Sequence, residues 1–76
     1  MTQNAQITAY AVITYALNAT PSTALYSTRV DAYKAAYAAV KAAGALTGVE
    51  YDDSSDTLIT FKGDTLNAEV EVHYAE

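Results

Sequence analysis

Residues 20–44 constrain the fold of this chain more than any other segment, because they carry the signals of one long helix. Alanine, the residue with the highest helix propensity, fills seven of the twelve positions from 32 to 43. Thr20 can cap a helix through its hydroxyl, and Pro21 suits the first helical position. Gly44 supplies a left-handed stop. We therefore predict a helix of about 20 residues that ends at Gly44.

Large side chains repeat within this segment at alternating spacings of four and three residues. This spacing places them on one stripe of a helix, which we expect to be buried: Tyr26, Val30, Tyr33, Tyr37 and Val40. The charged residues fall off the stripe and are expected to face water: Arg29, Asp31, Lys34 and Lys41.

Residues 5–17 alternate with a period of two and are rich in β-branched and aromatic types, which favours a strand. The odd positions are the more apolar, so we expect them to face the helix. The even positions are half apolar, because they include Tyr10, Val12 and Ala16. A helical interpretation stays open for this segment, with Tyr10, Ile13 and Leu17 on one stripe.

Residues 46–51 and 57–62 read as a hairpin, since the acidic and serine-rich residues between them favour a turn. Its inward face would hold Val49, Tyr51, Ile59 and Phe61. Residues 68–74 alternate as a last strand. Val70, Val72 and Tyr74 are expected inward, and Glu69, Glu71 and His73 outward.

The predicted order is strand, helix, strand, strand, strand. One helix laid on one face of a sheet is the simplest way to bury these stripes. We therefore predict an α+β fold in which one long helix packs on a mostly antiparallel sheet of three or four strands. Residues 1–76 are expected to form a single small domain, as their number suggests.

Charge is divided unevenly along the chain. Residues 1–44 have a net charge of +2, from Arg29, Lys34, Lys41 and Asp31. Residues 45–76 have a net charge of −7, because Lys62 stands among eight carboxylates. Nucleic acid repels such a surface, so no direct nucleic-acid binding is expected. A basic protein partner is compatible with it.

Two groups of residues could suggest a metal site, and we interpret both as structural. Glu69, Glu71 and His73 share a strand face, but a solvent-facing strand needs polar residues in any case. The acidic run at 52–56 fails the calcium-loop test, because Thr57 and Gly63 stand where the glycine and the bidentate glutamate belong. We predict no metal site.

Catalytic chemistry has few residues available. The chain has no cysteine, one histidine, no serine in a glycine-framed turn and no phosphate-binding glycine loop. A chain of this length buries only about 60% of its unfolded surface, so a deep pocket would remove much of its core. We predict that the protein is not an enzyme and uses neither a cofactor nor a small-molecule substrate.

The N-terminus lacks the features of a signal peptide or membrane span. Residues 1–4 carry no basic side chain, and the apolar run at 7–17 is about half the length that spans a bilayer as a helix. Together with the absence of cysteine, this predicts a cytoplasmic protein without membrane contact.

The run Tyr-Asp-Asp-Ser-Ser-Asp-Thr at 51–57, which follows the alanine-rich segment, resembles the second hairpin of the streptococcal immunoglobulin-binding β-grasp domains. The resemblance covers about a fifth of the chain. The tryptophan of that hairpin has no counterpart here, and a further strand follows Phe61. We therefore attribute the resemblance to shared turn chemistry and transfer no binding residues.

The leading functional hypothesis is a protein-binding or assembly module that acts through a sheet surface. Tyr10, Val12 and Leu58 are the candidate interface residues, expected on the face that the helix leaves bare. They would meet a partner protein or a second copy of the chain. A small viral or accessory protein would fit, although no residue demonstrates that origin. The alternative is an acidic decoy that occupies a basic nucleic-acid-binding cleft of another protein.

Overall fold

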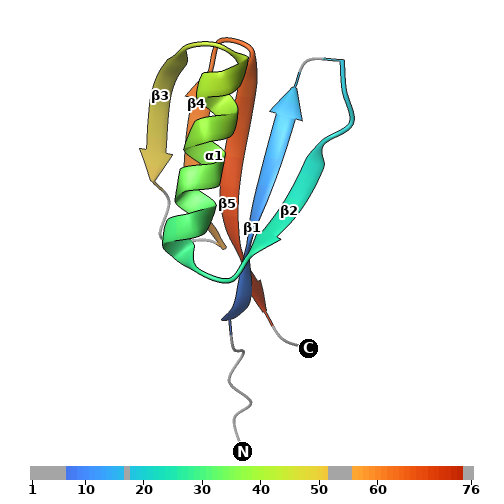
Figure 1. Cartoon of the computed structure of the whole chain (residues 1–76), viewed down its shortest axis with the longest axis vertical. Coiled ribbons are helices and arrows are strands. Elements are labelled where there is room, and N and C mark those ends of the chain that lie inside the picture. Colours follow the sequence, from blue (N-terminus) through green and yellow to red (C-terminus); the bar gives the residue numbers. More distant parts are fainter. Residues whose placement is uncertain (1–6, 17, 52–55, 75–76) are drawn as a thin grey trace, which may run out of the picture.

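One helix covers one face of a five-stranded antiparallel sheet (Figure 1). The structure is a computed structural model that describes residues 7–16, 18–51 and 56–74. The predicted α+β class and helix-on-sheet packing are confirmed. The predicted number of strands is wrong, because the described residues form a sheet of five strands rather than three or four.

The elements are β1 (Ile7–Ala16), β2 (Ser22–Tyr26), α1 (Arg29–Ala43), β3 (Leu46–Tyr51), β4 (Thr57–Gly63) and β5 (Leu66–Tyr74). Their order across the sheet is β2-β1-β5-β4-β3, so the first and last strands lie side by side in its middle. Each neighbouring pair is antiparallel. The sheet therefore consists of two hairpins, β1–β2 and β3–β4, joined through β5.

The additional strand is β2, in the segment where the helix was predicted to begin. Asn18 adopts a positive φ of 62°, a conformation that asparagine tolerates well, in the turn between β1 and β2. The helix begins at Arg29 and has 15 residues. Its cap is Thr28, whose hydroxyl oxygen accepts a hydrogen bond from the backbone N–H of Asp31 at 3.1 Å. Placing the cap at Thr20 was therefore wrong.

The end of the helix also differs from the prediction. The backbone N–H of Gly44 donates to the carbonyl of Val40 at 3.1 Å. The φ of Gly44 is 166°, which is extended rather than left-handed. Glycine leaves space here for the carboxylate of Asp64, which a Cβ at this position would displace.

The core lies between α1 and the three central strands. The helix contributes Ala32, Ala36 and Val40, all fully buried. The sheet contributes Val12, Ile59, Phe61, Ala68 and Val70. Alanines on the buried side of α1 let the helix approach the sheet closely, so the larger side chains come mainly from the strands.

The even positions of β1, not the odd ones, face the helix. Val12 lies opposite Val70, and Tyr10 lies opposite Val72. Ala11 lies opposite Glu71 and therefore faces the other way. The prediction was wrong because both faces of β1 are apolar, so the alternation within this strand does not distinguish them. The pairing with β5 decides the orientation.

The helix stripe was only partly predicted. Val40 is buried as expected, and Lys34 and Lys41 are exposed. Val30 and Tyr37, however, are 61% and 45% exposed. The helix packs through its alanines against β1, β5 and β4, which turns these two larger side chains toward the margin of the contact.

Candidate functional site

The predicted interface residues lie in the core region. Val12 is only 4% exposed, and Tyr10 packs against the buried cluster under α1. Leu58 packs there as well, next to Ile59 at a register irregularity between β4 and β5. The prediction that Tyr10 and Val12 point away from the helix is wrong, because Val12 lies opposite the buried Val70 and Tyr10 lies opposite Val72.

A different apolar surface is exposed beside β3. The helix lies over the centre of the sheet and leaves β3 at its margin (Figure 1). Tyr37 of α1 is 45% exposed, Val49 of β3 is 40% exposed and Tyr51 of β3 is 77% exposed. We name these three residues the β3 surface.

The residues of the β3 surface are linked through side chains on β4. The ring of Tyr37 meets Phe61 edge to face, with centroids 6.0 Å apart and an interplanar angle of 74°. Phe61 lies opposite Val49, and Ile59 lies opposite Tyr51. The shared face predicted for this hairpin is confirmed, but Val49 and Tyr51 are not covered by the helix.

Sequence reasoning assigned the tyrosines of the β3 surface to the core. The sequence did contain a signal that some tyrosines lie on the surface, namely their number, which is seven in a chain without tryptophan. Fifteen helical residues cannot cover a five-stranded sheet, so some of these rings must lie outside the contact. Which ones do so depends on where the helix sits.

The strand β3 is also an edge of the sheet among the described strands. It pairs with β4 on one side only, so its other side presents unpaired backbone N–H and C=O groups. Glu50 forms an ion pair with Lys62, with 2.7 Å between Oε2 and Nζ. Both side chains are well exposed, so this pair contributes about 0–1 kcal/mol to stability.

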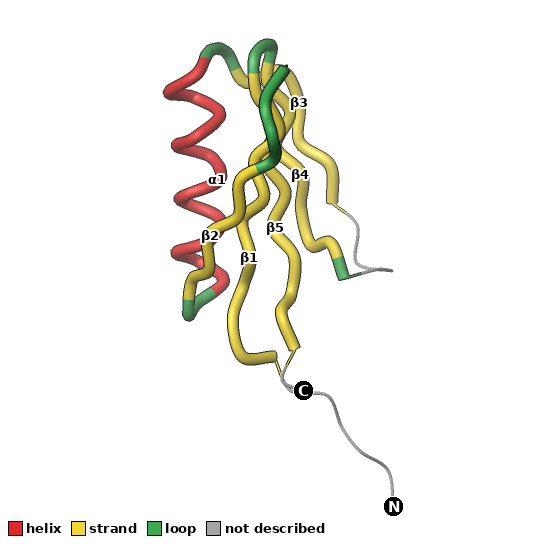
Figure 2. Tube along the Cα trace, turned by 90° about the vertical axis from the view of Figure 1, so that its right-hand side faces the viewer, coloured by secondary structure: helices red, strands yellow, loops and turns green. Residues whose placement is uncertain are grey.

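The second face of the sheet carries no described element (Figure 2). We name it the open face. It is apolar on one half, where β1 and β2 present Ile13 and Leu25 beside the buried Ala11. On the other half β5 presents Glu69, Glu71 and His73, which alternate with the buried Val70 as predicted, whereas Tyr74, predicted inward, is 39% exposed.

The carboxylates of the open face interact with one another and with a tyrosine. The hydroxyl of Tyr15 donates to Oε1 of Glu69 at 3.2 Å. Burial raises the pKa of Tyr15, and the charge of Glu69 raises it further. Burial also raises the pKa of Glu71, and the neighbouring carboxyl of Glu69 adds to the effect.

The described residues contain no group of three histidine, cysteine, aspartate or glutamate side chains arranged to hold a metal ion. The acidic run considered as a calcium loop lies largely outside the described residues, since 52–55 are not among them.

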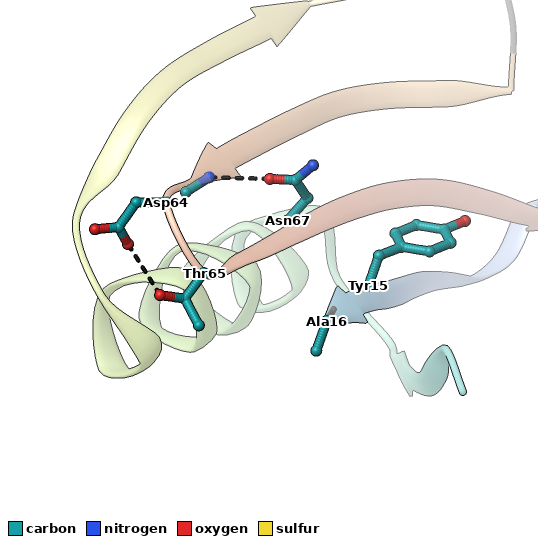
Figure 3. A pocket seen from close by; sticks show the side chains of 6 residues that line it. Tyr15, Ala16, Asp64, Thr65 and Asn67 are labelled. Carbon is teal, nitrogen blue, oxygen red and sulfur yellow. Dashed lines mark hydrogen bonds between the residues drawn. The ribbon is translucent and has the colours of Figure 1, made fainter. Parts of the chain in front are cut away.

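A shallow hollow of about 370 Å³ lies at the turn between β4 and β5 (Figure 3). Its polar groups are already used by the turn. The side-chain oxygen of Asn67 accepts from the N–H of Gly63 at 3.0 Å, and Asp64 accepts from the hydroxyl of Thr65 at 3.2 Å. We therefore interpret the hollow as turn structure and not as a ligand site.

Comparison with known proteins adds no relative to this description. No family model matches the chain, and neither a curated protein nor a solved structure matches it significantly. Within the described part of the chain, no helix has the length and apolar character needed to cross a membrane.

Proposed function

We propose that this chain is a non-enzymatic protein-binding module that accepts an extended segment of a partner protein along the outer edge of β3. The β3 surface carries the proposal, because Tyr37, Val49 and Tyr51 stay exposed beside an edge strand. In strand addition, the backbone of an edge strand supplies affinity, and adjacent side chains supply selectivity. Tyrosine is also enriched in protein interfaces.

The proposed partner segment alternates apolar and basic residues. In an added strand, every second side chain would face the helix side and meet the β3 surface. The remaining side chains would face the side on which Glu50 lies, opposite Thr60. The net charge of −7 in residues 45–76 favours basic residues at those positions.

The proposal can be tested by an NMR titration of the labelled protein with an eight-residue peptide that alternates valine and lysine. Binding is monitored through the chemical shifts of the backbone amides. Saturable shifts are expected for residues 46–51 and for Tyr37. Tyr51→Ser should weaken binding about tenfold, the effect of losing roughly 1.4 kcal/mol from an interface aromatic. Leu25→Ser is the matched control, because Leu25 is 56% exposed but lies on β2.

A second peptide separates strand addition from simple charge attraction. Methylation of alternate backbone amides, on the edge facing β3, preserves the charge of the peptide but prevents it from pairing with a strand. Binding by the methylated peptide as tight as by the parent would contradict the proposal.

The acidic decoy remains a second candidate, favoured by the carboxylates of the open face. Glu69 and Glu71 lie next to each other on this face, and the raised pKa of Glu71 reflects burial and the proximity of Glu69. A basic partner would relieve this repulsion. In the same titration, a decoy would show shifts at 69–73 instead of 46–51, and its binding would collapse with salt.

A further inference from the structure

Among the described strands, β2 forms the edge of the sheet opposite β3, and it carries neither a charge nor a register irregularity, two of the features that protect such edges. Its five residues carry no charge, and the first four are exposed. Its register with β1 is regular throughout. By contrast, β3 carries Glu50, so two copies of β3 would bring like charges close together, whereas the basic segment proposed for β3 would not.

The distribution of charge also distinguishes the two edges. The described acidic residues beyond position 45 all belong to β3, β4, β5 or their flanking turns: Glu50, Asp56, Asp64, Glu69 and Glu71. The sheet order places β1 between these strands and β2. Two copies that met at β3 would bring their acidic halves together, whereas two copies that met at β2 would keep them apart.

We propose that β2 is a self-association edge, where a second copy of this chain pairs antiparallel with it about a twofold axis. The length of β2 fixes the register. Only an axis at Ala24 pairs all five residues, with Ser22 of one copy opposite Tyr26 of the other and Thr23 opposite Leu25. Ala24 then lies opposite its own counterpart.

The resulting assembly would be a continuous sheet of ten strands with β3 at both outer ends. Both helices would lie on the same side of it, because an antiparallel pair has its twofold axis perpendicular to the sheet. Five residue pairs bury little surface, so the association is weak and concentration-dependent. It leaves the β3 surface accessible and does not depend on the function proposed for that surface.

The first test measures mass by light scattering from about 10 µM to about 1 mM, the range that corresponds to a weak interface. The wild-type mass should rise from 8.1 kDa toward twice that value. Ala24→Lys should stay monomeric, because it places like charges directly opposite each other. Ala24→Glu should do the same. An equimolar mixture of the two variants should associate at least as strongly as the wild type.

The matched control is Val49→Lys, which adds the same charge at the other edge and should leave association unchanged. A wild type that stays monomeric throughout this range would overturn the proposal. So would a mixture of the two charge variants that fails to associate although both are folded by circular dichroism.

A second measurement covers the case in which a charge at Ala24 disturbs the fold. The chain contains no cysteine, so Ala24→Cys introduces a single thiol. Directly opposed residues have Cα separations of about 4.5–5.5 Å, within the range of a disulfide. Mild oxidation should link Ala24→Cys faster than Val49→Cys. Equal rates for the two variants would exclude pairing at β2.

Discussion

The carboxylate of Asp64 occupies the space into which a Cβ at residue 44 would project. Its Oδ1 accepts hydrogen bonds from the backbone N–H of Ala45 at 3.0 Å and from the hydroxyl of Thr65 at 3.2 Å. The end of α1 is thereby joined to the turn between β4 and β5, which lies about twenty residues further along the chain. Gly44 permits this junction.

Gly44→Ala should destabilise the protein by about 1–2 kcal/mol, because the new methyl group displaces Asp64 from its hydrogen bonds. Urea unfolding measures the change. In an Asp64→Ala background the same substitution should cost much less, since the obstructing carboxylate is gone. Equal costs in the two backgrounds would contradict the proposed coupling between residues 44 and 64.

Gly63→Ala should be the more damaging glycine substitution. A Cβ at this position would lie 2.5 Å from the carbonyl oxygen of Leu66 and 2.6 Å from Cγ1 of Val40. Neither atom can move without disturbing the turn or the core, so we expect a loss of about 2–4 kcal/mol. Gly48→Ala is the control, because a Cβ there meets nothing within 4 Å. Thermal melts should rank Gly48→Ala above Gly44→Ala, and Gly63→Ala last.

Val40→Asp should unfold the protein, whereas Val30→Asp should not. Val40 is fully buried and a carboxylate there would lack any partner, which costs roughly 4 kcal/mol or more in a domain of this size. Val30 is 61% exposed and lies in the first helical turn, where a negative charge is favourable. Circular dichroism at 222 nm distinguishes the outcomes, and a folded Val40→Asp variant would contradict the assignment of the core.

Local signals in the sequence predicted most of the elements correctly. The bounds of the second hairpin and of the last strand agree with β3, β4 and β5 to within one or two residues. Residues 46–74 alternate cleanly or carry clear turn chemistry, so little else competes with the strand interpretation. The helix was also predicted, because alanine content is a strong local signal.

The errors arose where tertiary contacts decide between local alternatives. Residues 22–26 can extend a helix or form a strand, and the pairing of β2 with β1 selects the strand. The orientation of β1 depends on its pairing with β5, far away in the sequence. The candidate interface was chosen from that orientation. Because the orientation was predicted wrongly, Tyr10 and Val12 were assigned to the bare face.

Glu71→Gln should stabilise the protein at neutral pH and have no effect in acid. Burial and the neighbouring Glu69 raise the pKa of Glu71 in the folded state above its ordinary value of about 4.3. The folded state therefore holds this proton more tightly than the unfolded state. The contribution of Glu71 to the stability of the fold is most favourable below its ordinary pKa. This contribution is lost as the pH rises through the pKa that Glu71 has in the folded state. Melting temperatures from about pH 3 to about pH 8 measure this difference.

Glu69→Gln provides the control that separates the two causes. It removes the neighbouring carboxylate but leaves the burial of Glu71, so the pKa of Glu71 should fall only part of the way toward its ordinary value. The same substitution should lower the pKa of Tyr15, which now donates its hydroxyl to Glu69. Both groups can be followed by NMR titration. Two results would each contradict the repulsion between carboxylates on the open face. One is a Glu71→Gln variant that melts at the wild-type temperature at neutral pH. The other is a Glu71 carboxyl that titrates below its ordinary pKa of about 4.3.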